Sequence, residues 1–175
     1  MKKSGITFFV ILIIVLSVIA FYGSVPQKHT EYLRIHIRAN SNSDEDQGVK
    51  YVIKERVVEF LTPIVANCTD KASAERALRS NLSEIERVCD ALLKESGFSY
   101  KSKAAVRQEQ FPTRVYENVT LDSGVYDALI IELGSGKGDN WWCVVYPPLC
   151  FTESRVSYIY KSKIKEIIDG FFKST

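Results

Sequence analysis

The strongest constraint on the fold is a change in the spacing of apolar residues near residue 98. From Val49 to Leu93, apolar residues recur at three- and four-residue steps, the spacing of helices that bury one face. After residue 98, apolar and polar residues alternate, as in strands with one buried face. Helices and strands are therefore segregated along the chain. This order favours an α+β fold in which helices pack on one face of a mostly antiparallel β-sheet.

A strand followed by a helix is predicted at the start of the domain. Residues 32–38 alternate between apolar and polar side chains, which predicts a half-buried strand. Ser43 and Asp46 then have the spacing of a capping box, so a helix is expected to begin there. Pro63 should kink this helix or mark its last turn, because proline cannot donate the next helical hydrogen bond.

A second helical stripe follows a short connection. Thr69 or Asp70 can cap its N-terminus, and Gly97 is expected to cap its C-terminus. Polar residues near Asn81 interrupt the stripe, which predicts a bend there.

The alternating region predicts strands at residues 100–108, 125–133 and 141–146, and a short extended stretch at 114–120. The glycine-rich segment 134–140 is interpreted as the hairpin loop of a strand meander. It contains Gly-x-Gly-Lys-Gly, but it lacks the spacing of a phosphate-binding loop, and a strand follows it where such a loop needs a helix.

The N-terminus indicates export. After Lys2 and Lys3, no charged residue occurs before Lys28. Residues 1–25 are therefore predicted to be either a signal peptide, cleaved after Ala20, or an N-terminal membrane anchor. Either interpretation places the rest of the chain outside the cytoplasm.

The remainder is expected to form one domain, residues 26–151, and a tail. Residues 152–175 carry an apolar stripe that predicts an amphipathic helix packed back on the domain. Membrane contact is thus expected only through residues 1–25. The chain has 23 basic and 21 acidic side chains, and without Lys2 and Lys3 the two are equal in number. No nucleic-acid partner is expected, because nothing indicates the basic face that such binding requires.

Four cysteines lie in the exported part, where disulfides can form. Cys143 and Cys150 are seven positions apart around two prolines, and a chain that doubles back there would bring them within bonding range. They are the candidate disulfide. Cys68 and Cys89 would need a break in the helix between them, and Cys89 is otherwise a small core residue.

Few residues suggest catalysis. The chain has two histidines, His29 and His36, and no Cys-x-x-C pair. A cysteine protease would need a cysteine beside a histidine, and Cys143 with His36 is the one combination we considered. We interpret them instead as a structural cysteine and a surface histidine. No catalytic, metal-binding or cofactor-binding residue is predicted. Alternation sends Trp141 and Trp142 to opposite faces of the sheet.

Several segments resemble the stage II sporulation protein R family of endospore-forming bacteria. The similar segments are Leu33–His36, Ala39–Ser43, Asp46–Gln47 with Lys50, Phe111–Thr113, Thr120–Leu129, Gly136–Val144 and Pro147–Phe151. The resemblance spans residues 32–151, and the block around the two tryptophans is its most specific part. No residue after Phe151 contributes to it.

The resemblance implies a signalling role without catalysis. A member of this family is made in the forespore and exported into the space between the two membranes. There it activates a membrane-embedded aspartic protease, stage II sporulation protein GA, in the mother-cell membrane. That protease processes the precursor of sigma factor E. The export segment found above is what this role requires.

Under this hypothesis a surface of the domain engages the protease. The candidate residues are Asn40, Ser41, Asp46, Gln47, Lys137, Asn140, Trp141, Trp142, Pro147 and Pro148. An interface of this kind would rely on a few buried anchors, for which tryptophan is favoured. The alternative hypothesis is an exported hydrolase acting on cell wall or peptide through Cys143 or His36.

Overall fold

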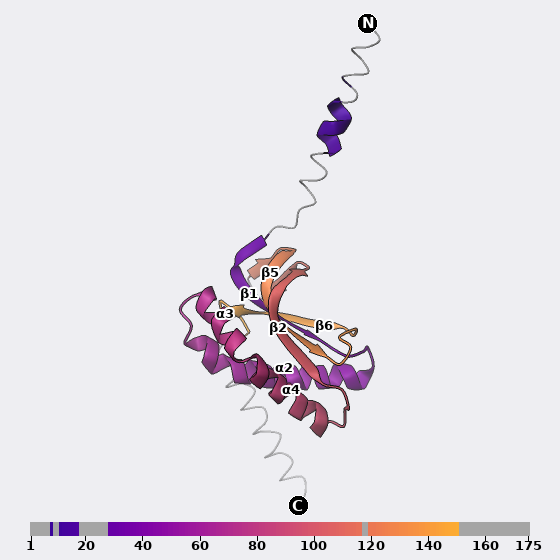
Figure 1. The fold of residues 1–175 in the computed structure, drawn as a ribbon, viewed down its shortest axis with the longest axis vertical. Helices are drawn as coiled ribbons and strands as arrows, with labels where there is room; N and C mark the ends of the chain where they lie inside the picture. The colour runs from indigo at the N-terminus through magenta and orange to yellow at the C-terminus, as the bar shows by residue number, and fades with distance from the viewer. Residues whose placement is uncertain (1–7, 9–10, 18–27, 117–118, 151–175) are drawn as a thin grey trace, which may run out of the picture.

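The structure is a computed structural model that describes residues 8, 11–17, 28–116 and 119–150. Its elements are β1 (Lys28–Arg38), α2 (Asp44–Ala66), α3 (Lys71–Ser80), α4 (Leu82–Glu95), β2 (Ser102–Phe111), β3 (Arg114–Tyr116), β4 (Val119–Leu121), β5 (Gly124–Leu133) and β6 (Asn140–Tyr146). Figure 1 shows how the strands and helices are arranged. The described residues therefore form an α+β fold, as predicted.

The main sheet has four strands in the order β2-β5-β1-β6. β2 pairs antiparallel with β5, and β6 pairs antiparallel with β1. The central pair, β1 with β5, is parallel. The sheet is thus mostly antiparallel, as predicted, but the predicted meander is wrong. β1 inserts between β5 and β6, so the 134–140 segment crosses over β1 and does not close a hairpin between neighbouring strands.

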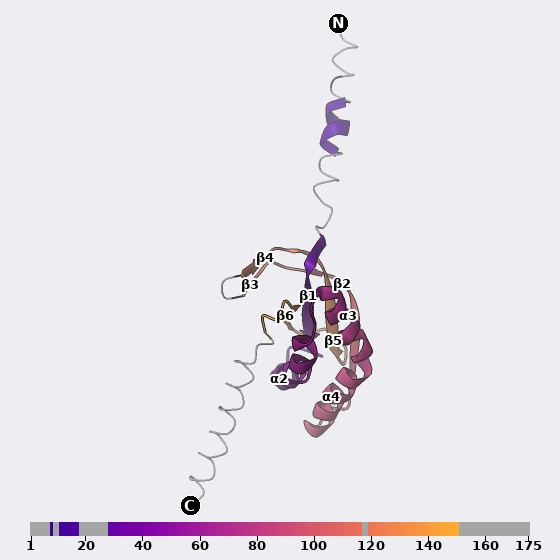
Figure 2. The same ribbon diagram turned by 90° about the vertical axis from the view of Figure 1, so that its left-hand side faces the viewer.

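β3 and β4 form a separate two-stranded sheet. The sequence indicated only an extended stretch here, because each strand has three residues and no clear alternation. Figure 2 shows this hairpin projecting from the main sheet, away from α3 and α4.

One face of the main sheet carries the core. Leu33, Ile35 and Ile37 are fully buried there against α2, α3 and α4. We call the opposite face the outer face. A smaller apolar cluster lies on it, made of Phe111, Tyr126, Ala128 and Ile130. The predicted packing of helices on one face of the sheet is confirmed for the described residues.

Local signals set the helix ends. The Ser43 side chain accepts a hydrogen bond from the backbone N–H of Asp46, and Pro63 lies in the last turn of α2. Asp70 caps α3 in a capping box with Ser73. The predicted bend is a break at Asn81, and Gly97 ends α4 with a positive φ of 84°.

α4 also covers the free edge of strand β2. The Asp90 carboxylate accepts hydrogen bonds from the backbone N–H and the hydroxyl of Ser102, at 2.7 and 2.8 Å. Glu86 accepts from the backbone N–H of Ala104 at 2.8 Å. These carboxylates satisfy donors of edge strand β2 that no neighbouring strand reaches.

Two predicted segments lie largely or wholly outside the described residues. Of residues 1–25, only residue 8 and residues 11–17 are described. They are helical, and their apolar side chains are exposed. In the described parts of the chain, no helix combines the length and the apolar character needed to cross a membrane. The tail, residues 152–175, lies wholly outside the described residues.

Candidate functional site

A polar cluster with two buried charged residues at its centre joins the end of β1 to the start of α2 and to the loop after β5. We call it the polar junction; it consists of Asn40, Ser41, Asp46, Gln47, Lys50, Tyr100, Ser135 and Asp139. Asp46 lies at its centre with 4% of its surface exposed. Its carboxylate accepts hydrogen bonds from Asn40 Nδ2 at 2.9 Å, and from Ser41 Oγ and the Tyr100 hydroxyl at 2.5 Å each.

These hydrogen bonds set the charge of the cluster. Burial alone would raise the pKa of the Asp46 carboxyl, but hydrogen bonds from Ser41, Tyr100 and Asn40 outweigh it and hold that pKa below its usual value. Burial, together with the contact to Asp46, raises the pKa of the Tyr100 hydroxyl. Asp46 is therefore an anion at neutral pH, and Tyr100 remains a donor to it.

Asn40 joins the end of β1 to the loop after β5. Its Oδ1 accepts from the backbone N–H of Ser135 at 2.9 Å, and its carbonyl accepts from the Ser135 hydroxyl at 2.6 Å. Gly138 donates from its backbone N–H to the carbonyl of Ala39 at 2.8 Å. A Cβ atom on Gly138 would collide with the backbone carbonyl of Ser41. Glycine is therefore needed here for close packing of two backbones.

Lys50 is 1% exposed and completes the polar junction. Its Nζ donates to Gln47 Oε1 at 2.6 Å and to the carbonyl of Asp139 at 3.1 Å. Gln47 in turn donates from Nε2 to the carbonyl of Ser41 at 2.9 Å. Burial lowers the pKa of Lys50, and the charge of Asp139 acts against that change.

The four candidate residues between positions 40 and 47 thus have hydrogen-bond partners within the chain. Asn40, Ser41, Asp46 and Gln47 direct their polar groups into the polar junction, where they hold β1, α2 and the loop together. Lys137, by contrast, is exposed. The first four residues have a structural role whether or not a partner also contacts them.

A network of ion pairs lies on the outer face. Arg38 contacts Glu109 and lies 2.9 Å from Glu132. Arg107 lies 2.8 Å from Glu132 and 3.5 Å from Glu109. His36 Nδ1 lies 2.9 Å from Glu109 Oε1. Glu109 therefore connects three basic side chains on two strands of the sheet.

His36 is on the predicted side of β1 but is not a surface residue. It is 4% exposed, because Trp142 stacks on its ring at 5.3 Å and the Phe111 ring meets it edge-on at 5.7 Å. Burial lowers the pKa of His36, so the ring is neutral at pH 7. Its proton then lies on Nδ1, since Glu109 can only accept. Nε2 is an acceptor that has no hydrogen-bond partner among the described residues.

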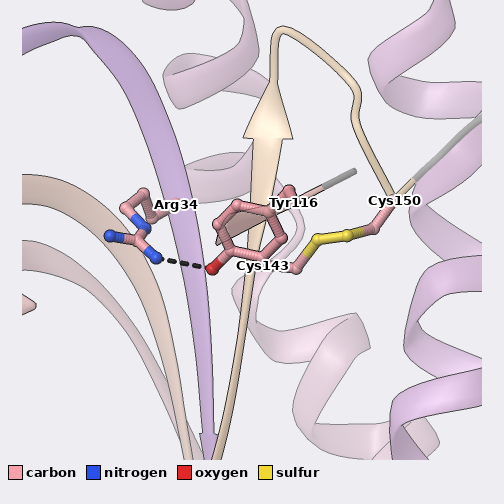
Figure 3. Close-up of a disulfide and its surroundings, with 4 residues drawn as sticks. All are labelled: Arg34, Tyr116, Cys143 and Cys150. Atoms are coloured by element: carbon pink, nitrogen blue, oxygen red, sulfur yellow. Dashed lines mark hydrogen bonds between the residues drawn. A yellow bond between two sulfur atoms is a disulfide. The ribbon is translucent and has the colours of Figure 1, made fainter. Parts of the chain in front are cut away.

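Arg34 lies two residues before His36 on the same face, and none of its surface is exposed. Its Nη2 donates to the Tyr116 hydroxyl at 2.6 Å (Figure 3). The guanidinium also lies 4.2 Å from the ring centre of Phe111 and 4.8 Å from that of Tyr126. These are cation–π distances.

The two tryptophans lie on opposite faces, as predicted. Trp141 packs against the main core, with Lys54 Nζ 5.9 Å from its ring centre. Trp142 lies on the outer face, between His36 and the guanidinium of Arg114, which is 4.2 Å from its ring centre. Both are only partly buried. Each therefore has atoms available to a partner.

The end of β6 is closed by a disulfide between Cys143 and Cys150, the candidate pair (Figure 3). Their Cα atoms are 6.4 Å apart. Between them, Pro147 follows a cis peptide bond and is exposed, and Pro148 is half-buried. Asn140 opens the same strand and is also half-buried.

The other two cysteines, Cys68 and Cys89, are free. Cys89 is a core residue, as its position on the helical stripe indicated, and burial raises the pKa of its thiol to about 12. The thiol is therefore protonated and unreactive at neutral pH.

The residues considered for hydrolysis are not brought together. Cys143 is bonded to Cys150 and faces the core, whereas His36 lies on the outer face. Among the described residues, no serine, threonine or cysteine is hydrogen-bonded to His36 Nε2, so none is placed as its nucleophile. The described part of the chain also contains no group of three residues that could hold a metal ion.

Comparison with known proteins identifies the family. The family profile described as Stage II sporulation protein R matches residues 29–156. The chain belongs to the stage II sporulation protein R family. Both the polar junction and the outer face lie within the matched residues, so the family resemblance of the sequence is confirmed.

A curated relative of the same name is known. The Stage II sporulation protein R of Bacillus subtilis (strain 168) is 38% identical over 121 residues. The match covers 69% of this chain and 54% of the relative, so the chain spans about half the length of the curated relative it matches. No solved structure matches. Membership of the stage II sporulation protein R family supports a role in sporulation.

The sequence did not single out several residues of this site. Glu109, Tyr100 and Tyr116 looked like ordinary strand residues, because their partners are more than 50 positions away. Arg34 was part of the family resemblance but was not a candidate. The one local signal was that basic residues occupy every second position from Arg34 to Arg38, which indicates a charged face.

Proposed function

We propose that this chain is an exported signalling protein of sporulation. It is made in the forespore, and residues 1–25 carry it across the forespore membrane into the intermembrane space. There it activates stage II sporulation protein GA, the membrane-embedded aspartic protease that processes the precursor of sigma factor E. The observation that carries the proposal is the family match over residues 29–156.

Two features support export. The described residues between 11 and 16 expose apolar side chains, from 40% for Leu12 to 63% for Ile13, as expected of a segment made for a bilayer. The Cys143–Cys150 disulfide supports a compartment outside the cytoplasm, because disulfides rarely persist in reducing cytosol.

Export can be tested in a sporulating strain that lacks its own member of the family. We expect this chain, expressed in the forespore, to restore processing of the sigma factor E precursor. A variant without residues 1–25 should not restore it, and joining that variant to an unrelated export signal should. The measurements are immunoblots of the precursor and a sigma-E-dependent reporter. Equal processing with and without an export signal would contradict the proposal.

The proposed contact surface centres on Trp142. Arg114 and His36 cover its two sides, yet the ring is half-exposed on the outer face. The exposed Lys137 and Pro147, with Asn140 and Pro148, are the other candidate residues for this surface, whereas Trp141 lies on the opposite face of the sheet. A half-exposed tryptophan beside a cation is typical of residues that dominate binding energy.

We expect Trp142→Ala to lower sigma factor E processing at least tenfold and to reduce capture of the domain by the extracytoplasmic part of the protease. Thermal unfolding of the purified variant checks that the fold survives. Val115→Ala is the matched control, because Val115 is an apolar residue 67% exposed on the β3–β4 hairpin. A folded Trp142→Ala variant that signals normally would remove Trp142 from the interface.

A further inference from the structure

The guanidinium of Arg34 lacks an anionic partner. It is completely buried, yet no carboxylate lies within ion-pair distance of it in the described part of the chain. Its Nη2 donates to Tyr116, while Nε and Nη1 have no acceptor among the described residues. Three N–H groups are therefore without a partner.

The surrounding rings do not replace that partner. Phe111, Tyr126 and Tyr116 have ring centres 4.2, 4.8 and 5.6 Å from the guanidinium carbon. Their faces stabilise the positive charge, but they cannot satisfy the N–H groups in the guanidinium plane. A buried charge in this state destabilises the fold. Stability of the fold therefore does not explain why this position is an arginine.

A second unpartnered atom lies beside it. His36 Nε2 is buried without a hydrogen bond of acceptable geometry among the described residues, although the Asn140 side chain interacts with the ring and acts to raise its pKa. His36 follows Arg34 by two positions on the same face of β1. Arg34 therefore presents unsatisfied donors beside the unsatisfied acceptor of His36. An acidic residue in an extended peptide supplies both complements, a carboxylate for Arg34 and an N–H group for His36.

The cover over Arg34 is a small element that is separate from the main sheet. The β3–β4 hairpin has no strand pairing with the main sheet, and it is joined to the sheet by two short exposed connections (Figure 2). An isolated two-stranded hairpin is only marginally stable. Its first strand contacts the rest of the domain through Tyr116 with Arg34 and Arg114 with Trp142, and Tyr116 also packs against the main core.

We infer that Arg34 is a recognition site for the carboxylate of an acidic side chain, supplied by an extended segment of a partner protein that enters between the β3–β4 hairpin and the outer face. The inference rests on the proposed function, since the partner would be the extracytoplasmic part of the protease. It adds a residue that was not a candidate and states the chemistry of the segment that binds it.

The first test is Arg34→Met, which keeps an unbranched apolar stem and removes the guanidinium with its charge. Because the charge is unpaired, the variant should unfold at the same temperature as the unchanged chain or higher, while sigma factor E processing falls at least tenfold. Arg107→Met is the control, since Arg107 is exposed and ion-paired on the same face. A lower unfolding temperature for Arg34→Met would overturn the inference, because the hydrogen bond to Tyr116 and the ring contacts would then more than offset the unpaired charge, and a structural role would explain Arg34. So would normal processing by the variant.

The second test uses overlapping peptides that span the extracytoplasmic part of the protease. At least one should bind the purified domain, and replacing one of its Asp or Glu residues by Asn or Gln should weaken binding at least tenfold. Arg34→Met should remove the difference between the two peptides, whereas Arg34→Lys should retain part of it. Binding that is unaffected by every acidic replacement would overturn the inference.

The two proposals fail in different ways. If the unchanged chain neither binds nor activates the protease, the proposed function is wrong. If the unchanged chain activates the protease and the folded Arg34→Met variant does so equally well, only the role of Arg34 is wrong.

Discussion

Replacing Asp46 by asparagine is expected to lower the free energy of unfolding by about 3 kcal/mol at pH 7. The carboxylate accepts from Asn40 and Ser41 at one oxygen and from Tyr100 at the other. An asparagine would place an NH2 group against at least one of these donors, and it would remove the charge that strengthens the other hydrogen bonds. Urea unfolding of the purified domain measures the loss.

Acidification should reduce the difference in free energy of unfolding between the unchanged chain and the Asp46→Asn variant. The folded-state pKa of Asp46 lies below the value in the unfolded chain, so its contribution to stability is fully present above that unfolded value, about 3.9. The contribution is lost as the pH falls further, through the folded-state pKa. The unchanged chain should therefore approach the stability of Asp46→Asn below about pH 4. A constant difference from pH 7 to pH 3 would show that the charge of Asp46 is not responsible.

Asp44→Asn is the matched control for this prediction. Asp44 occupies the first turn of the same helix but is exposed. Its loss should change the free energy of unfolding by no more than about 0.5 kcal/mol, as for most surface substitutions. An equal effect of the two variants would mean that the helix terminus, and not the polar junction, is sensitive to charge.

Removing the disulfide is expected to cost about 2.5 kcal/mol. Cys143 and Cys150 are 7 positions apart, and closing a loop of this size restricts the unfolded chain by roughly that amount in the chain-entropy description. Cys143→Ala, Cys150→Ala and the double variant should lose similar amounts, because each removes the same bond. Urea unfolding with and without a reductant measures the effect.

The reductant supplies an internal check. It should destabilise the unchanged chain as much as either substitution does, and it should leave the variants unaffected. Cys68→Ala is the control, since Cys68 is half-buried and free, and that variant should still respond to reductant. A double variant that is much less stable than either single variant would show that packing of the two side chains, and not the bond, provides the stability.

Much of the local structure could be predicted because its causes lie within a few residues. The hydroxyl of Ser43 meets a backbone N–H three positions later, and Gly97 supplies the positive φ that ends α4. The opposite orientation of Trp141 and Trp142 follows from the pleat of a strand. The break at Asn81 was also expected from the sequence.

The order of the strands could not be predicted in this way. β1 pairs with β5 and β6, which begin about 100 residues later, and a meander would satisfy the same alternation. Alternation specifies which side chains face the core but not which strand lies next to which. The hydrogen-bond partners of the candidate residues could not be predicted either, because they lie far away in the sequence. Asp46, for example, contacts Tyr100 across 54 positions.

The sequence by itself determined the α+β class, the helix ends, the disulfide pair and the family, because each follows from side chains close together in the chain or from a motif. Tertiary structure alone decided that β1 lies at the centre of the sheet, that Asn40 and Ser41 bind the buried carboxylate of Asp46, and that Arg34 is enclosed without an anion. Burial and hydrogen-bond partners depend on which distant segments meet, and no local pattern encodes that meeting.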